Sequence, residues 1–332
     1  MADSFSDRVD VYTRVTNQII DAIEAGADRW EMPWHVAENT GYPVNALTGK
    51  AYRGVNILTL WVESHLKGFS DPTWATYKQW QELGKQVSKG ERSTTGVFWK
   101  RLEDNSEDGR DGDQEAEPER GQGRMMARAF SLFNAAQTEG YEPPALEPKP
   151  DHERIENAEA FFRAIGADIR HGGSKAYYHP TNDYIQMPPF EVFRDPEAYY
   201  ATLGHESIHL TGHKSRLDRD LKGRFGDESY AAEELIAELG AAFLAASLNL
   251  TPEPRPEHAA YVQSWLKCLK ADNRAIFTAA SHAQRAADYL HSKQSPAPEP
   301  NPPRDPGGGP EQPTRPERPE PVLTRRLRAP GL

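Results

Sequence analysis

Apolar side chains recur at helical spacing near the start of the chain, at positions 11, 15, 19, 20 and 23, and Gly26 follows them. This spacing predicts an amphipathic helix that ends at the glycine. Apolar positions likewise predict helices at residues 55–65 and 155–165. A further helix is expected after Asp195, because a capping aspartate followed by proline favours a helix start. From residue 229 to the C-terminal tail the pattern is helical.

Short runs of aromatic and β-forming residues predict strands between these helices. Residues 96–100 and 127–133 flank a polar stretch, and we interpret them as two strands of one sheet. Two more strands are predicted at 175–179 and 183–187, joined by a turn that contains proline and asparagine. The mixture predicts an α+β fold, with an α/β N-terminal part and a mostly helical C-terminal part.

Two stretches that cannot form a core divide the chain, and a third ends it. Residues 101–124 contain almost no apolar side chains, so they cannot offset the entropy lost on ordering, and we expect a flexible acidic insert. A proline-rich linker is predicted at 143–152, and 12 of the 27 prolines lie in a tail at 295–332. The prediction is an N-terminal domain at 1–142 and a second domain at 153–294.

Composition and charge exclude several classes of protein. With 37% hydrophobic residues in 332, the chain can bury a core, so full disorder is excluded. A net charge of −11 excludes a globally basic nucleic-acid binder, although not a local basic face. A single cysteine, Cys268, excludes a disulfide scaffold and a multi-cysteine zinc site. No apolar run approaches the roughly 18 residues of a membrane span, so we expect a cytoplasmic protein without a membrane partner.

A metal-binding pattern lies in the helix predicted after Asp195. His205 and His209 are four residues apart, so both imidazoles lie on one helix face and can share an ion. Glu206 stands beside them and can take a proton from water that the ion activates. This is the HExxH pattern of zinc metallopeptidases. Two exposed histidines on an ordinary helix are the alternative, but the small and apolar neighbours of the pair favour a buried metal site.

A third ligand must come from elsewhere. His213 lies eight residues after His205, a helical rise of roughly 12 Å, which is too far for a shared ion. The helix expected around residues 230–246 presents Glu234 and Glu238 on a face otherwise rich in alanine. Their spacing resembles the thermolysin-like pattern, which implies Glu234 as ligand and Glu238 as the acid that orients a ligand histidine; the reverse assignment stays open. We expect one Zn²⁺, with other divalent metals such as Mn²⁺ as alternatives.

Neighbouring side chains allow further roles. Tyr178 and His179, in a predicted strand just before the HExxH helix, are candidates to stabilise an oxyanion, with aromatic packing as the alternative. Glu233 is expected to point away from the metal and to be solvated.

The N-terminal part combines aromatic and basic residues. Six of the seven tryptophans lie in the first 99 residues, and residues 50–100 contain eight basic and four acidic side chains. Aromatic faces stack on unpaired bases while cations follow the phosphates, which indicates single-stranded DNA, although an aromatic taken alone is more often a core residue. The candidate DNA-binding residues are Trp34, Asn45, Lys50, Tyr52, Arg53, Asn56, Trp74, Tyr77, Lys85 and Lys89.

Several segments resemble ArdC-type antirestriction proteins of plasmids and phages. In the N-terminal part they include Thr48-Gly-Lys-Ala-Tyr-Arg-Gly-Val-Asn56, Trp74-Ala-Thr-Tyr-Lys-Gln79 and Gly84-Lys-Gln-Val-Ser-Lys-Gly90; in the C-terminal part they include residues 199–213 and 233–244. The resemblance implies a single-stranded-DNA-binding domain followed by a zincin-like metallopeptidase domain. It also implies protection of incoming DNA from host restriction, with a DNA-bound protein or restriction enzyme as a target.

Two other functions remain open. One is a non-catalytic DNA-binding protein whose metal is structural or regulatory, and the other is an acidic DNA mimic formed by residues 101–124. Glu206 favours the enzyme over both, because a structural zinc site has four protein ligands and needs no general base.

Overall fold

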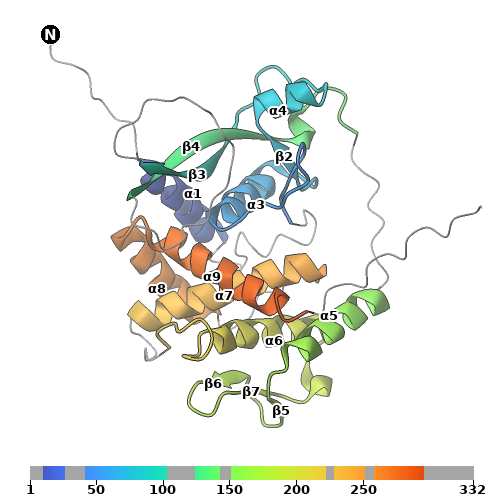
Figure 1. Ribbon diagram of the computed structural model, residues 1–332, viewed down its shortest axis with the longest axis vertical. Helices are drawn as coiled ribbons and strands as arrows, with labels where there is room; N and C mark the ends of the chain where they lie inside the picture. Colours follow the sequence, from blue (N-terminus) through green and yellow to red (C-terminus); the bar gives the residue numbers. More distant parts are fainter. Residues whose placement is uncertain are drawn as a thin grey trace, which may run out of the picture. The chain divides into compact units, whose positions relative to one another are not determined.

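A computed structural model describes residues 10–26, 42–102, 124–142, 151–221, 228–250 and 258–294 (Figure 1). Most of the predicted acidic insert, most of the predicted linker, the whole predicted tail and Trp34 lie outside these residues. The mixture of helices and sheets confirms the α+β fold class.

The first half of the described chain contains a four-stranded sheet with helices. In chain order the elements are α1 (Val11–Gly26), β1 (Val44–Asn45), α3 (Val55–Lys67), β2 (Thr73–Ala75), α4 (Tyr77–Glu82), β3 (Thr94–Leu102), β4 (Arg124–Asn134) and the short η2 (Ala135–Gln137). The strand order is β1-β2-β4-β3, with β1 and β2 parallel and the other pairs antiparallel. The strands predicted on either side of the acidic insert are confirmed as neighbours, with Gly96 opposite Phe130.

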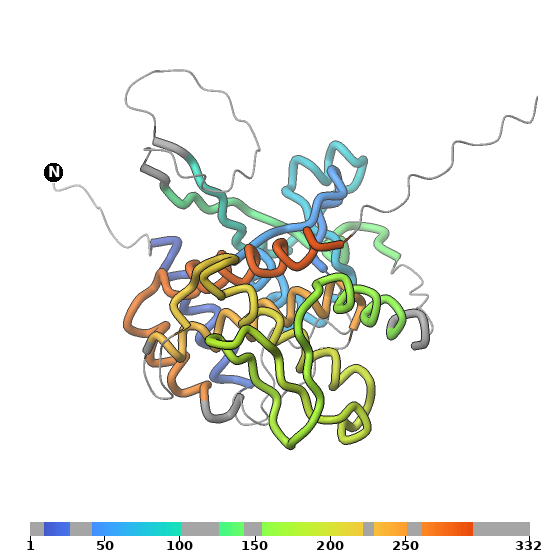
Figure 2. The backbone as a smooth tube through the Cα atoms, turned by 60° about the horizontal axis from the view of Figure 1, so that its bottom comes forward, coloured from blue at the N-terminus to red at the C-terminus, as the bar shows by residue number. Residues whose placement is uncertain are grey.

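The second half is mostly helical, as predicted. Its elements are α5 (Asp151–Ile165), β5 (Ile169–His171), β6 (Tyr177–His179), β7 (Tyr184–Met187), η3 (Phe190–Val192), α6 (Pro196–Thr211), α7 (Glu228–Leu248), α8 (His258–Ala271) and α9 (Ala275–His291). Helix α5 begins at Asp151, inside the predicted linker. The small sheet has the order β5-β7-β6 and contacts α6, which also packs against α7, α9 and α5 (Figure 1, Figure 2).

Helix α6 starts where the sequence predicts it. The Asp195 carboxylate accepts a hydrogen bond from the Ala198 backbone N–H at 2.8 Å, and Pro196 occupies the first turn. Its contact with α7 is close because α7 has a glycine there: a Cβ at Gly240 would lie 2.7 Å from the Ile208 side chain. Gly240 therefore lets the two helices approach until their polar side chains meet.

One hydrophobic core joins the two halves. Trp61 of α3 lies with its ring centroid 5.9 Å from that of Phe243 in α7, and each side chain is 1% exposed. Polar contacts reinforce the junction, since the Gln284 side-chain oxygen on α9 accepts from the Gly54 backbone N–H at 3.1 Å and from the Tyr42 hydroxyl at 3.3 Å. The parts of the chain predicted as separate domains thus share buried surface.

Candidate metal centre and nucleic-acid surface

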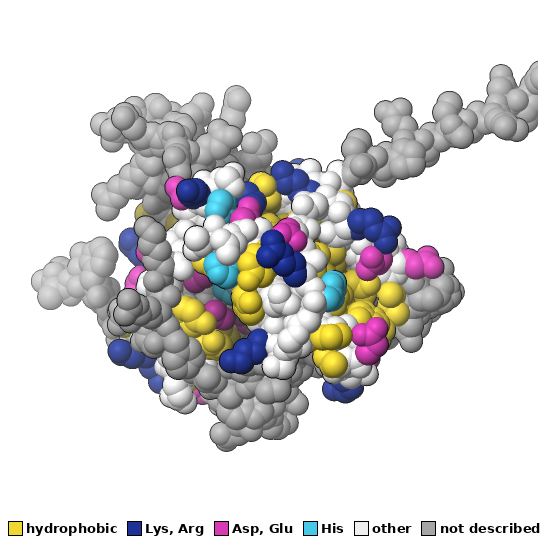
Figure 3. Space-filling view, turned by 90° about the horizontal axis from the view of Figure 1, so that it is seen from below, with side chains coloured by type: hydrophobic (Ala, Val, Ile, Leu, Met, Phe, Trp, Pro, Cys, Tyr) yellow, Lys and Arg dark blue, Asp and Glu magenta, His cyan; other side chains and the backbone are white. Residues whose placement is uncertain are grey.

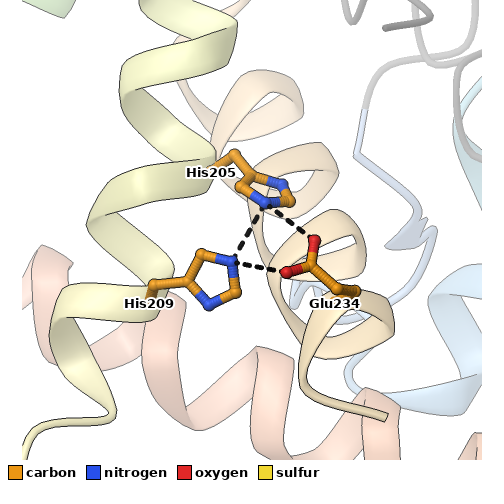
Figure 4. Close-up of side chains that lie close together, drawn as sticks. All are labelled: His205, His209 and Glu234. Carbon is orange, nitrogen blue, oxygen red and sulfur yellow. Dashed lines mark hydrogen bonds and ion pairs between the residues drawn. The ribbon is translucent and has the colours of Figure 1, made fainter. Parts of the chain in front are cut away.

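Three buried side chains converge between α6 and α7 (Figure 4). The Nε2 atoms of His205 and His209 are 3.1 Å apart, and they lie 3.5 and 3.6 Å from the two carboxylate oxygens of Glu234. Donors that bind zinc at about 2.0–2.1 Å in a tetrahedron are separated by about 3.3 Å. The spacing and chemistry of these donors therefore fit one divalent ion.

Neighbouring groups shift the pKa of Glu234 and of His209. Burial alone would raise the pKa of Glu234, but the hydrogen bond with His205 and the charges of both histidines outweigh it and lower the pKa to about 2. Burial alone would lower the pKa of His209, and the hydrogen bond to Glu233 with the surrounding carboxylates raises it instead. The cluster thus keeps a carboxylate facing two imidazoles, a donor set that suits a cation.

Two more glutamates flank the histidines on their far sides. The Glu238 carboxylate lies 3.8 Å from Nδ1 of His205, a buried atom without a hydrogen-bond partner among the described residues. Glu233 lies 3.1 Å from Nδ1 of His209. The expectation that Glu233 is solvated is wrong: it is 7% exposed, because the Arg219 guanidinium compensates its charge at 2.8 and 2.9 Å.

A cavity of about 770 Å³ opens beside the histidines. Glu206 lines it and is 6% exposed. Other walls come from β6, the start of α6, and the tyrosines Tyr230 and Tyr261. Figure 3 shows a face on which acidic side chains are recessed between hydrophobic ones. The site therefore combines a metal-binding donor set, a carboxylate and space for a ligand.

The two oxyanion candidates are placed differently. Tyr178 lines the cavity, but its hydroxyl donates to Asp183 at 2.8 Å and accepts from Arg216 at 3.1 Å. Burial and the Asp183 carboxylate raise the Tyr178 pKa. His179 stacks on Tyr184 and is not among the residues that line the cavity. Sequence reasoning missed Tyr230, which lies one turn before Glu234 on α7 and so could have been found from helical spacing.

The structure separates the candidate DNA-binding residues into buried and exposed groups. Trp74, Tyr52 and Asn56 are 0%, 3% and 6% exposed, so they are core residues and offer no face to a base in this conformation. The Asn56 amide, for example, bonds the backbone N–H and C=O of Val97 in β3 at 2.7 and 2.8 Å. Arg53 is partly exposed, and its guanidinium is 2.5 Å from the Asp288 carboxylate on α9.

The exposed candidates lie on neighbouring segments. They comprise Lys50 in the turn after β1, Tyr77 in α4, and Lys85 and Lys89 after α4. The Asn45 amide connects the turn to α4 by donating to the Gln79 side-chain oxygen at 3.1 Å. Tyr77 is 43% exposed. We call residues 45–50 and 77–90 the α4 surface; it lies beside the larger sheet, away from α6 (Figure 1).

Two models of known protein families match different parts of the chain. A model of the N-terminal domain of anti-restriction factor ArdC matches residues 9–133, and a zincin-like metallopeptidase model matches residues 156–282. The fold and the site thus define a protein with an ArdC-type N-terminal part and a zincin-like metallopeptidase part.

Solved structures of a similar protein show the family to which this chain belongs. The crystal structure of antirestriction protein ArdC from plasmid R388, metal-free, is 44% identical and matches with a TM-score of 0.70 over 86% of this chain and 97% of that one. The Mn(II)-bound structure of the same protein is 42% identical and matches with a TM-score of 0.68 over 86% of this chain and 98% of that one. The chain belongs to the ArdC family of antirestriction proteins.

Two curated proteins extend the comparison. The uncharacterized protein y4eC of Sinorhizobium fredii is 53% identical over 290 residues, which cover 87% of this chain and 94% of y4eC. A DNA primase TraC of Escherichia coli is 38% identical over 289 residues, which cover 84% of this chain but 27% of the primase. The ArdC-like region is thus found both alone and within a longer protein. In the described part of this chain, no helix is long and apolar enough to cross a membrane.

Proposed function

We propose that this protein binds single-stranded DNA, uses a divalent metal to hydrolyse peptide bonds, and protects the incoming DNA of a mobile element from host restriction in the cytoplasm. The observation that carries the enzymatic part is the convergence of His205, His209 and Glu234 beside a cavity that Glu206 lines. The family membership supports the antirestriction role.

His205, His209 and Glu234 would hold the ion, which we propose to be Zn²⁺. Mn²⁺ is the alternative, since the relative from plasmid R388 has a Mn(II)-bound form. Three protein ligands are typical of catalytic zinc sites, whereas structural sites have four. Among the described residues the cluster offers three. A bound ion would act as a Lewis acid and activate water for attack.

Residues of the chain itself supply the remaining functions. Glu206 takes a proton from the attacking water and returns it to the leaving amine. Strand β6 lines the cavity and, among the described strands, pairs only with β7, so an extended polypeptide can add alongside it. Together with the family membership, this leads us to propose as substrate a protein bound to the same DNA, such as a restriction enzyme. A non-catalytic protein with a structural metal would need neither Glu206 nor this cavity.

The α4 surface is proposed to hold the DNA strand. Tyr77 presents a partly exposed ring for stacking, and Lys50, Lys85 and Lys89 present exposed ammonium groups for phosphates. Because duplex DNA hides its base faces, this surface should favour single strands. Trp34, also a candidate, lies outside the described residues.

One experiment tests the proposal as a whole. The full-length protein is loaded with Zn²⁺ or Mn²⁺ and incubated with restriction enzymes, with and without single-stranded DNA, and the products are identified by mass spectrometry. Metal-dependent cleavage that Glu206→Gln abolishes supports the peptidase. Stoichiometric metal and DNA binding without cleavage would instead support the non-catalytic protein.

A further inference from the structure

Arg219 is a buried cation beside the proposed metal centre, hydrogen-bonded through all three of its guanidinium nitrogens. Its side chain is 4% exposed. One guanidinium nitrogen donates to the Ile208 backbone C=O and another to the Thr211 hydroxyl, both at 2.7 Å. Nε and Nη2 donate to the two oxygens of Glu233. Arg219 therefore connects the last turns of α6 to α7.

Glu233 contacts both Arg219 and His209, which is a proposed metal ligand. The oxygen that accepts from Arg219 Nη2 also lies 3.1 Å from Nδ1 of His209. A carboxylate only accepts hydrogen bonds, so Nδ1 of His209 must be the donor, and Nε2 keeps its lone pair when the imidazole is neutral. That Nε2 is the atom directed at His205 and Glu234.

The local backbone is adapted to Arg219. A Cβ at Gly212, where α6 ends, would lie 3.0 Å from the Arg219 guanidinium and 2.8 Å from Leu221. Glycine at this position therefore makes room for the guanidinium under the end of the helix. Leu221 and Asp220, which follow Arg219, both line the cavity.

We infer that Arg219 and Glu233 are positioning residues that hold His209 in the orientation and tautomer that bind the metal. This inference rests on the proposed metal centre and extends it beyond the three ligands and Glu238. Partners that orient a metal-binding histidine typically change metal affinity by 10–100-fold when they are lost.

The chain contains a matched control, Arg216, five residues after the end of the same helix. Arg216 also donates to a backbone C=O of α6, that of Leu210, and also pairs through two nitrogens with a carboxylate, Asp183. One Asp183 oxygen is shared with a ring group, the Tyr178 hydroxyl. The two clusters thus match in kind, but only the acid paired with Arg219 contacts a proposed metal ligand.

The experiment compares Glu233→Gln with Asp183→Asn in the full-length protein. Because both oxygens of each carboxylate accept from the arginine, each amide replaces one of these acceptors with an NH2 donor and so disturbs its arginine. Calorimetric titration of the metal-free proteins with Zn²⁺ and Mn²⁺ gives the affinity. The absorption spectrum of the Co²⁺-loaded proteins reports the geometry around the ion. We expect Glu233→Gln to bind Zn²⁺ 10–100-fold more weakly with an altered Co²⁺ spectrum, and Asp183→Asn to match the wild type in both.

A second pair, Arg219→Lys and Arg216→Lys, decides the question if Glu233→Gln does not fold. Lysine keeps the charge but loses the planar fork, so weaker metal binding is expected only from Arg219→Lys. Wild-type affinity in Glu233→Gln and Arg219→Lys, or equal losses in the two pairs, would overturn the inference. A wild-type protein that binds no metal would instead refute the proposed centre itself.

Discussion

Truncation of Phe243 tests whether the two halves of the chain unfold together. Phe243 belongs to α7 in the zincin-like half, yet its ring packs against Trp61 of the N-terminal half, with centroids 5.9 Å apart. Both side chains are 1% exposed, so Phe243→Ala leaves a cavity at the junction and should cost about 3–5 kcal/mol. With about 2.1 cal/mol/K of unfolding entropy per residue, each kcal/mol lowers the melting temperature of a cooperative unit of roughly 300 residues by about 1.6 °C. The expected decrease is therefore roughly 5–8 °C.

The assay is differential scanning calorimetry of the full-length, metal-free protein, with DNA binding and metal binding measured along the same temperature series. DNA binding and metal binding should be lost in one and the same unfolding transition. Phe243→Ala should lower the temperature of that single transition. Leu66→Ala is the control, because Leu66 is 62% exposed and its truncation should cost little. Two transitions, of which the variant shifts only the one that carries metal binding, would refute the shared core. For the same reason, a fragment ending near residue 142 is a poor test of DNA binding, since it would expose Trp61.

Five substitutions test the proposed sites. Glu234→Ala should abolish stoichiometric metal binding measured by elemental analysis, whereas Glu206→Gln should retain the ion; a metal-free Gln variant would show that Glu206 is a ligand. Glu238→Ala should weaken metal binding by about 10–100-fold, and a metal-free Glu238→Ala protein beside a loaded Glu234→Ala protein would reverse the two roles. Tyr77→Ala should weaken single-strand binding by about 1–3 kcal/mol in fluorescence anisotropy with little change in salt dependence. Lys85→Ala should lower the salt slope by about 0.7, and an unchanged slope would remove this lysine from the DNA surface.

Local patterns predicted most of the framework. The cap formed by Asp195 and the spacing of His205 and His209 depend on neighbours within one or two helical turns, so the sequence displays them directly. The face shared by Glu234 and Glu238 is local in the same sense. Their arrival at His205 depends on the packing of α6 on α7, which the alanine-rich face of α7 indicates.

Contacts between distant residues escaped prediction. The sequence predicts a solvated Glu233 because nothing in its own helix indicates its partner, Arg219, which lies 14 residues earlier. The sequence predicts that the Tyr178 hydroxyl can stabilise an oxyanion, because nothing in its strand indicates the hydrogen bond from Arg216, 38 residues later. Trp74 and Tyr77 are both aromatic and lie three residues apart, so the sequence does not distinguish them. In the structure Trp74 is buried in the core, whereas Tyr77 is 43% exposed. The one sequence signal for the burial of Glu233 was its place on a helix face that is otherwise apolar.

The close contact at Gly240 also bears on which ion the proposed centre selects. The histidines belong to α6 and Glu234 to α7, so the separation of the two helices sets the size of the space between the donor atoms. Ile208 fills the room that any larger residue at position 240 would occupy. Zinc requires donors at about 2.0–2.2 Å, whereas calcium requires about 2.3–2.6 Å. A larger residue at position 240 is therefore expected to push α7 away from α6, to widen the space between Glu234 and the two histidines, and to favour a larger ion over zinc.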